Sequence, residues 1–220
     1  MNQRMKQIAD AAARLFLRQG YAKTQISHIA KAVGVSVGTV YLDFAGKKEI
    51  LHAILKSALD PSFWERELER PITEELFAGL ESEIMAAFEQ SQEDFASHLQ
   101  GGAAEYDFES LISDAFDILA RYAVGCLFIE KNQYDFPNLT QHYMAYRRKF
   151  LDTMVRYLRV FIEQGKLRPV ENLELTAELI VEMLSWWAMD VRYTAFETKD
   201  ISPDLAKQIC MDNLTAAYRR

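Results

Sequence analysis

The 220-residue sequence contains little glycine, proline or cysteine, and it has no long hydrophobic run. Its 9 glycines and 5 prolines leave few places for turns, which favours long helices over a sandwich of many short strands. The two cysteines, Cys126 and Cys210, lie too far apart for a metal or redox motif and are too few for a disulfide framework. Such cysteine usage is typical of a protein in a reducing compartment.

The sequence also lacks the signals of export and of membrane insertion. Its longest unbroken apolar stretch, Tyr122–Ile129, has eight residues, whereas a helix that crosses a bilayer needs about 20. Arg4, Lys6 and Asp10 precede any apolar run, so no signal peptide is visible. The sequence therefore predicts a cytoplasmic protein that does not contact membranes.

Motifs of the common enzyme and metal sites are missing. The four histidines form neither an HExxH pattern nor a pair at i, i+4. A nucleophile elbow, a phosphate-binding loop and a glycine-rich dinucleotide motif are missing as well. The sequence predicts no catalytic residue, no bound metal and no cofactor.

The net charge of −7 is distributed unevenly along the chain. Residues 1–60 contain 9 basic and 4 acidic side chains, whereas residues 61–220 contain 16 basic and 28 acidic ones. A basic first quarter can bind an anion such as nucleic acid, while an acidic remainder avoids one. The sequence thus indicates a small anion-binding head on a larger body.

Apolar residues recur at the spacing of α-helices along nearly the whole chain. Ile8, Leu15 and Phe16 belong to one such stripe, which ends at Gly20. The helices expected after it have approximate bounds of 24–33, 37–44, 47–59, 73–100, 106–131 (as a helical pair), 139–164, 172–196 and 203–220. The sequence therefore predicts an all-α fold of about nine to ten helices.

The most informative pattern lies in residues 24–47. Thr24 can cap the first of two short helices, and Ser36 can cap the second. Gly34 suits the positive φ that the turn between them requires, and Val35 can fill the angle between the helices. This spacing is that of a helix-turn-helix, whose second helix enters the major groove of DNA. An ordinary corner between two packed helices has the same spacing and remains the alternative at this point.

A dense and ordered set of positions between residues 8 and 51 narrows that choice. The set comprises Phe16, Gly20, Tyr21, Thr24, Ile29-Ala30, Gly34-Val35-Ser36, Gly38-Thr39, Tyr41, Phe44, Lys47 and Leu51. It resembles the N-terminal domain of the TetR-type transcriptional repressors. Beyond it the chain resembles that family in architecture alone, including Leu151–Pro169 followed by an apolar helix.

The resemblance implies a division of the chain and a set of partners. Residues 1–46 would form a three-helix DNA-binding domain, and residues 47–220 a larger helical bundle for ligand binding and dimerisation. The helix Lys47–Leu59 would connect the two parts. The implied partners are a double-stranded, palindromic DNA operator, a second copy of the chain, and a small apolar or amphipathic effector that releases the protein from DNA.

The resemblance also assigns roles to individual residues of the head. Thr39 and Tyr41 stand at positions where hydroxyl groups contact phosphates, and Lys47 stands where a lysine pairs with a phosphate. Four further residues would approach base edges, where hydrogen bonds and methyl contacts carry sequence information. Gln25, at the entry of the first helix, and the two expected caps, Thr24 and Ser36, complete the set. The candidate DNA-binding residues are therefore Thr24, Gln25, Ser27, Ser36, Val37, Gly38, Thr39, Tyr41, Leu42 and Lys47.

The pair Leu42-Asp43 departs from the family pattern, which often has an aromatic residue or histidine there. Because a carboxylate beside a phosphate is repulsive, we expect Asp43 to face away from DNA or to bond a base or a basic side chain. Residues 37–44 contain no Arg, Lys or Asn. DNA shape and apolar methyl contacts should therefore contribute more to recognition than strong hydrogen-bond donors do.

Aromatic residues and methionines are abundant in the body, and they suit a large apolar cavity with polar groups in its wall. The residues expected to line such a pocket are Tyr106, Tyr122, Cys126, Tyr143, Tyr146, Trp186, Trp187 and Met189. A second apolar set on the two long helices near the C-terminus predicts a twofold dimer interface. It comprises Phe150, Met154, Leu158, Phe161, Leu179 and Met183.

A different class of function also fits the aromatic residues. A helical carrier or enzyme could use the same cavity without binding DNA. It would need an ionisable pair in the cavity, for which Glu105, Asp107 and His142 are the candidates. Their spacing supports no catalytic arrangement, so the regulator is the preferred interpretation.

Overall fold

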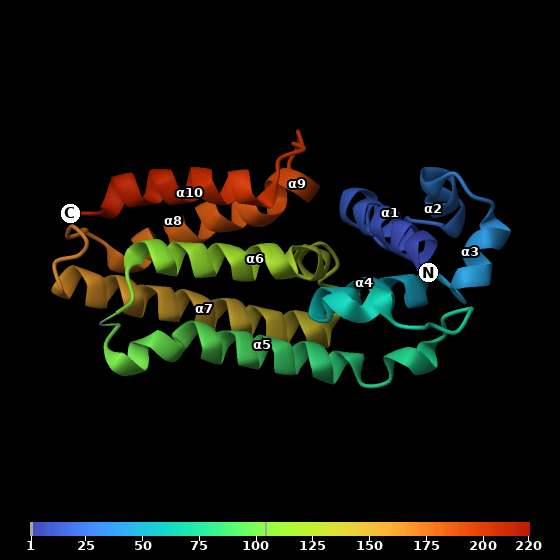
Figure 1. Cartoon of the computed structure of the whole chain (residues 1–220), viewed down its shortest axis with the longest axis horizontal. Helices are drawn as coiled ribbons and strands as arrows, with labels where there is room; N and C mark the ends of the chain where they lie inside the picture. Colours follow the sequence, from blue (N-terminus) through green and yellow to red (C-terminus); the bar gives the residue numbers. More distant parts are fainter. Residues whose placement is uncertain (1, 104) are drawn as a thin grey trace. The chain divides into compact units, whose positions relative to one another are not determined.

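The computed structural model describes residues 2–103 and 105–220, and the regular elements within these ranges are all helical (Figure 1). The elements of the first half are α1 (Gln3–Gln19), α2 (Ile26–Val33), α3 (Val37–Asp43), α4 (Lys47–Leu59), the short 3₁₀ helices η1 (Pro61–Glu65) and η2 (Glu74–Phe77), α5 (Leu80–Ala96) and η3 (Ser97–Gly101). Those of the second half are α6 (Phe108–Lys131), α7 (Pro137–Glu163), α8 (Leu173–Ser185), the π-helical turn η4 (Trp186–Asp190), α9 (Val191–Tyr193) and α10 (Pro203–Tyr218). The predicted all-α class is confirmed.

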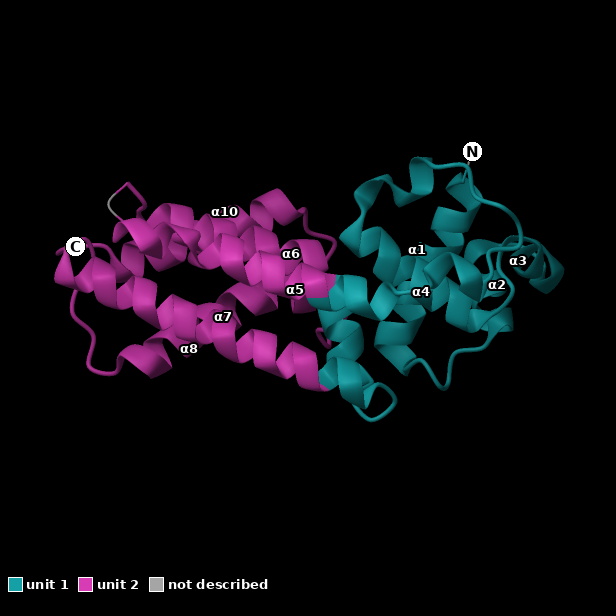
Figure 2. Cartoon of the chain, turned by 90° about the horizontal axis from the view of Figure 1, so that it is seen from below, with its two compact units in different colours: residues 1–85, 124–140 teal, residues 86–123, 141–220 magenta. Residues whose placement is uncertain are grey.

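The helices divide into two compact units (Figure 2). Unit 1 comprises the chain up to Met85 together with Val124–Thr140, and unit 2 comprises Ala86–Ala123 and Gln141–Arg220. Unit 1 thus contains α1–α4, the start of α5 and the corner between α6 and α7. The functional division expected at residue 46 stays a prediction.

Unit 1 has a continuous apolar core beneath its first four helices. Ile8, Ala12 and Phe16 of α1 are buried, as the helical spacing predicts. Helix α1 contacts both α2 and α4, and its last turn closes with the Gly20 N–H donating to the Phe16 carbonyl. Phe16 also meets Phe128 of α6 edge to face, with ring centroids 6.4 Å apart. This core supports α2 and α3 from below.

The predicted helix over residues 73–100 is interrupted in the structure. A 3₁₀ turn, η2, ends at Phe77, and α5 begins only at Leu80. Gly79 lies between them with φ of +85°, a conformation that most residues avoid and that ends helical hydrogen bonding. The sequence predicted a helical pair over 106–131, but the structure has a single helix there, α6. The break between helices falls before Phe108, so α6 is continuous up to Lys131.

Unit 2 is built around α7. Phe150 stacks on Phe95 with ring centroids 4.5 Å apart, and the Tyr157 hydroxyl donates to the Phe95 carbonyl over 2.6 Å. The assignment of four α7 residues to a dimer interface is therefore wrong. Each of the four is at most 3% exposed within a single chain, because each packs into the core of unit 2: Phe150, Met154, Leu158 and Phe161.

Two of the predicted helix starts in unit 2 have the expected caps. The Asn172 side chain accepts the Leu175 N–H at the start of α8, and the Ser202 hydroxyl accepts the Leu205 N–H at the start of α10. Within the described ranges, no helix is both long enough and apolar enough to cross a membrane.

Candidate nucleic-acid interface and a cavity in the same unit

The turn between α2 and α3 has the geometry of a helix-turn-helix. Gly34 adopts a left-handed conformation with φ of +79°, and its N–H donates to the Ala30 carbonyl over 2.9 Å. The Val35 N–H donates to the same carbonyl over 3.0 Å, which closes α2. A residue with a Cβ would be strained at position 34, so glycine fixes the angle at which α3 leaves α2.

Ser36 starts α3 as its N-cap. The Ser36 hydroxyl oxygen accepts the Thr39 N–H over 3.0 Å and lies 2.9 Å from the Thr39 hydroxyl oxygen. At the start of α2, Gln25 and His28 form a reciprocal capping box. Both helices therefore begin with ordered polar groups on the exposed side of unit 1.

Most of the candidate DNA-binding side chains are exposed. Within α3, Val40 is fully buried and anchors the helix, so the opposite face points to solvent. Tyr41 is 49% exposed and Leu42 is 66% exposed, which is unusual for large apolar side chains. Thr39 is half-buried, and the exposed members of the set are Gln25, Ser27, Ser36, Val37, Gly38, Tyr41 and Leu42.

Thr24 and Lys47 face inward. The Thr24 side chain is buried, and its hydroxyl donates to the Gly20 carbonyl over 2.8 Å. The expectation that Thr24 caps this helix is wrong, since Gln25 is the N-cap of α2, and the place of Thr24 among the DNA-binding residues stays a prediction. The Lys47 ammonium donates to the carbonyls of Tyr21 and Thr24 over 2.8 and 3.1 Å and lies 4.2 Å from the centre of the Tyr21 ring. Lys47 thus ties the α1–α2 loop to the start of α4, and its phosphate contact stays a prediction.

Asp43 at the end of α3 is fully buried and pairs with basic side chains. The Arg4 guanidinium binds its carboxylate with two bonds of 2.6 and 2.8 Å, and Arg70 Nη1 lies 3.3 Å from Oδ1. The sequence predicted a basic partner for Asp43 as one of its alternatives. It missed Arg70, since nothing in the local pattern relates residues 27 positions apart.

Arg70 belongs to a segment that crosses the end of α3, residues 60–79, which we call the strap. The Ile72 N–H donates to the Asp43 carbonyl over 2.8 Å, and the Ala45 N–H donates to the Ile72 carbonyl over 2.9 Å. Asn2 holds the strap from the other end, since its side-chain amide donates to the carbonyls of Trp64 and Arg66. The strap therefore fixes the C-terminal end of α3 through backbone and side-chain bonds.

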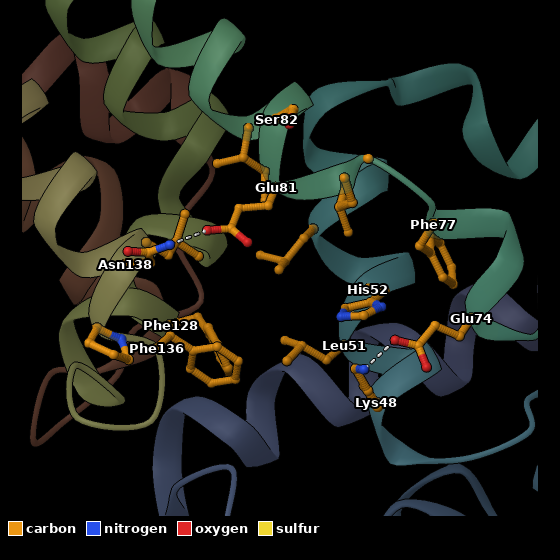
Figure 3. Close-up of a pocket in the computed structure, with 16 residues that line it drawn as sticks. Lys48, Leu51, His52, Glu74, Phe77, Glu81, Ser82, Phe128, Phe136 and Asn138 are labelled. Carbon is orange, nitrogen blue, oxygen red and sulfur yellow. Dashed lines mark hydrogen bonds and ion pairs between the residues drawn. The ribbon is translucent and has the colours of Figure 1, made fainter.

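The strap also forms part of the wall of a cavity in unit 1, with a volume of about 540 Å³ (Figure 3). The wall is mostly apolar and comes from α4, from η2 and the start of α5, and from the corner between α6 and α7. The lining residues are Lys48, Leu51, His52, Leu55, Glu74, Phe77, Gly79, Leu80, Glu81, Ser82, Ile84, Phe128, Phe136, Pro137, Asn138 and Leu139. None of the eight residues predicted to line a pocket lies in this wall.

Two polar pairs and one histidine interrupt the apolar wall. Lys48 and Glu74 form an ion pair, and the Asn138 amide donates to the Glu81 carboxylate over 3.4 Å (Figure 3). The His52 ring meets Phe77 edge to face, with ring centroids 5.4 Å apart. Burial, and next the positive charge of Lys48, lower the pKa of His52 below its ordinary value, which favours the neutral ring.

Several of the residues predicted to line a pocket lie in unit 2 and have other surroundings there. Tyr106 stacks on His98, and its hydroxyl donates to the Asp114 carboxylate over 2.7 Å. Burial is the main cause that raises the pKa of the Tyr106 phenol. Tyr143 and Tyr146 pack against Phe88, whereas Trp186 is exposed. These side chains fill the core or face solvent.

The catalytic alternative gains no support from its candidates. The Asp107 carboxylate accepts the Ser110 N–H over 2.8 Å, so it caps α6, and this bond lowers its pKa. Nowhere in the described ranges do three or more His, Cys, Asp or Glu side chains come together as metal ligands would. Asp107 therefore has a structural role in starting a helix.

The chain matches known proteins most clearly over the helix-turn-helix. Residues 8–54 match the family described as bacterial regulatory proteins, tetR family. Residues of the same region align with the HTH-type transcriptional regulator HbdR of Aromatoleum sp. (strain CIB), at 42% identity over 72 residues, which is 33% of this chain and 31% of HbdR. Over these residues the chain resembles the tetR family. The predicted resemblance is confirmed.

Further relatives agree with this match. The fatty acid metabolism regulator protein of Bacillus subtilis (strain 168) is 43% identical over 53 residues, 24% of this chain and 27% of that protein. The uncharacterized HTH-type transcriptional regulator YfiR of the same organism is 24% identical over 201 residues, 91% and 86% of the two chains. The alignments thus span less than a third of HbdR and of the fatty acid regulator. These relatives are regulators, not enzymes.

A solved structure has the same fold over the whole chain. The ketosteroid transcriptional regulator KstR2 of Mycobacterium tuberculosis superposes with a TM-score of 0.58, at 15% identity, over 100% of this chain and 97% of that one. At this identity the likeness shows the fold alone. It supports the arrangement of a helix-turn-helix followed by a helical bundle.

Proposed function

We propose that this TetR-type regulator is a ligand-responsive repressor, located in the cytoplasm, that binds a palindromic operator as a homodimer. The observation that carries the proposal is the outer surface of α2 and α3. Large apolar and hydroxyl side chains are exposed there. The two helices belong to residues 1–60, which contain nine basic and four acidic residues. Such a surface fits a duplex, because hydroxyls and helix N-termini bind phosphates and apolar groups contact thymine methyls.

An exposed stripe on α8 supports the dimer. Leu175, Leu179 and Met183 of α8 follow one another at helical spacing, and Trp186 of the adjoining η4 continues the stripe. Leu175, Leu179 and Trp186 are exposed, Leu179 by 56%, and Met183 is half-buried. Ion pairs between α7 and α8 border the stripe, among them Arg147–Glu182 at 3.0 Å. An apolar centre with a polar rim is typical of protein interfaces, and a twofold axis lets the same stripe cover itself. Leu179 and Met183 thus remain candidates for the interface.

Repression and release follow from the spacing of two heads. In a dimer, two α3 helices about 34 Å apart would reach successive major grooves on one side of the duplex. A small molecule that favours another spacing lowers the affinity for DNA through a coupling free energy, typically about 1–3 kcal/mol. We propose a small apolar or amphipathic effector for this role.

Selection from random DNA duplexes tests the proposal without knowledge of the target genes. We expect an enriched palindrome, and we expect its affinity to fall steeply with salt because phosphate contacts dominate. Tyr41→Ala should weaken binding to the enriched duplex about tenfold while the fold, followed by circular dichroism, stays intact. If no sequence is enriched, or if binding does not depend on salt, the chain does not act on DNA in this way.

A further inference from the structure

A buried carboxylate at the end of α3 holds two arginines that come from other parts of unit 1. Asp43 is 0% exposed, whereas the side chain of Arg4 on α1 is 43% exposed and that of Arg70 on the strap is 36% exposed. We call these three residues the arginine clamp. A buried carboxylate is costly unless it is paired, so the pairing keeps both arginines beside α3. With two positive charges and one negative charge, the clamp carries one net positive charge.

The hydrogen bonds within the clamp occupy one edge of the Arg4 guanidinium. Its Nε donates to Oδ2 of Asp43 over 2.6 Å, and its Nη2 donates to Oδ1 over 2.8 Å. Both bonds lie on the side edge of the planar group. The end edge, formed by Nη1 and the second proton of Nη2, is another fork of two donors. Such a fork matches two oxygens of a phosphate, and the exposure of the Arg4 side chain allows a phosphate to approach it.

The clamp lies at the border of the surface that we propose to meet DNA. Leu42, directly before Asp43, is exposed and belongs to that surface. Helix α3 has 7 residues, so its length of about 10 Å is close to the width of the major groove, which is about 12 Å. When the N-terminal end of such a helix contacts base edges, its C-terminal end lies next to the phosphates that line the groove.

The two arginines of the clamp have different neighbours along the chain. The nearest charged residue to Arg4 is Lys6, whereas Arg70 directly follows Glu69. Because a glutamate repels a phosphate, Arg4 is the better ligand for one. Arg70 keeps Asp43 paired when Arg4 also binds a phosphate. The backbone bonds of Ile72 to both sides of Phe44 keep this part of the strap in place.

We propose that Arg4 binds a phosphate of the DNA backbone through the end edge of its guanidinium, and that Asp43 is a positioning residue that orients the guanidinium for this contact. The proposal rests on the proposed function, since the phosphate belongs to the operator. It adds a contact from α1 to those of α2 and α3, and it gives the strap a part in DNA binding. A carboxylate in the helix that enters the groove thereby strengthens the binding of a polyanion.

The salt dependence of binding tests the contact of Arg4. Arg4→Gln is compared with the unmodified chain by fluorescence anisotropy, with a duplex enriched by selection, at several salt concentrations. We expect the affinity to fall about tenfold and the slope of log affinity against log salt to fall by about one phosphate contact per half-site. Arg14→Gln removes the same charge from an exposed position of α1 and is the matched control, which should keep the slope. An unchanged slope in Arg4→Gln, or an equal reduction in Arg14→Gln, would overturn the proposal.

Asp43→Asn separates positioning from the effect of charge alone. If charge alone matters, removal of a carboxylate from the DNA-binding unit strengthens the binding of DNA. If Asp43 positions Arg4, the same substitution weakens binding about three- to tenfold, because the amide has one accepting oxygen and loses the two-bond contact. Affinities are measured below the temperature at which thermal unfolding of the variant begins. Tighter binding by Asp43→Asn contradicts the positioning role.

Neutral methylphosphonates in the duplex, introduced at one backbone position at a time, locate the phosphate. At the contacted position the substitution should lower the affinity of the unmodified chain about three- to tenfold. In Arg4→Gln the same duplex should bind within about twofold of the unsubstituted one. A purely structural role of Arg4 leaves the remaining contacts as they are, so the penalty at every position would then be the same in both chains. That result contradicts the contact even where Arg4→Gln is less stable.

Failure of this contact and failure of the proposed function are distinguishable in the same experiments. If selection enriches no duplex, the proposed function fails and the contact fails with it. If a palindrome binds with a steep salt dependence, while Arg4→Gln keeps both the slope and every phosphonate penalty, the proposed function stands and the contact alone is wrong.

Discussion

Helices α3 and α8 both expose large apolar side chains, but their charged surroundings differ. In α3 the single charged residue is Asp43, which is buried, and the surrounding segment has an excess of basic residues. Helix α8 carries three glutamates and no basic residue, and two of these glutamates pair with arginines of α7. The apolar surface of α3 can therefore approach a polyanion, whereas that of α8 suits a protein surface with a similar ionic rim.

Exposure of apolar residues does not by itself identify a partner. An exposed leucine is equally available to a thymine methyl and to another leucine. The sign of the charge around it decides which approach is favourable. Substitutions that change this charge, one helix at a time, should therefore change which partner each helix binds.

The largest effect is expected for Leu179→Glu in α8. A carboxylate in the middle of a symmetric apolar stripe would be buried twice, next to its own copy, at a cost of several kcal/mol. The chain should become monomeric in analytical ultracentrifugation and lose about 100-fold or more in affinity for a palindromic duplex. The control is Phe196→Glu, which adds the same charge at a fully exposed position outside α8. A Leu179→Glu variant that stays dimeric would show that α8 is not the interface.

A smaller effect is expected for charges placed on α3. Leu42→Glu should weaken DNA binding about 10- to 100-fold, because the new carboxylate faces phosphates, and Leu42→Lys should strengthen it and steepen its salt dependence by about one phosphate contact. Both are measured by fluorescence anisotropy at several salt concentrations. Since Leu42 is exposed, neither change should alter thermal stability. Equal effects of the two charges would remove α3 from the DNA interface.

The accuracy of the sequence-based predictions follows the same division. Val40 in the short helix α3 and Phe44 just after it are buried and hold the helix by one side, so the pattern leaves little choice for the exposed face. In α7 the stripe that contains Phe150 and Phe161 looks the same whether it packs against its own chain or against a second copy. Periodicity reports that a face is buried, but it does not report what buries it.

The cavity could not be predicted for a related reason. Its wall combines α4, the turn at Gly79 and the corner before Leu139, which lie far apart in the sequence. The aromatic residues chosen as pocket candidates, such as Tyr106 and Tyr146, serve core packing instead. Amphipathic aromatics are needed in both settings, so composition alone does not separate a filled core from a hollow one.

The ion pairs of the two helices should differ in strength. Arg4 binds a carboxylate that is 0% exposed, whereas Arg147 and Glu182 are both exposed. Arg4→Gln should lower the free energy of unfolding by about 1–2 kcal/mol, since Arg70 remains beside Asp43, and Arg147→Gln should lower it by less than about 0.5 kcal/mol. Urea titrations compare the two. Similar losses of unfolding free energy in the two variants would mean that burial of the Asp43 carboxylate adds nothing to the strength of its ion pair.

The smallest effect concerns His52, in the same unit as α3. Its surroundings include Lys48 and Glu49 on α4, Glu74 on η2 and Glu81 on α5. Burial, and next the positive charge of Lys48, lower its pKa and outweigh the opposite effect of Glu49 and Glu74. The unfolded chain then binds a proton more readily than the folded chain. The contribution of the neutral His52 ring to the free energy of unfolding is therefore complete above the unfolded pKa of about 6.5. It is lost as the pH falls from there toward the pKa of the folded chain.

In His52→Phe this part of the acid-induced loss of stability should disappear, so unfolding midpoints at pH 5 and pH 8 should lie closer together than in the unmodified chain. Because the ring is only partly buried the change is shallow, and the exposed His98→Phe variant provides the slope against which to judge it. A steeper loss at acidic pH in His52→Phe would mean that His52 is stabilised as the charged form, and that its position beside Glu74 outweighs its burial.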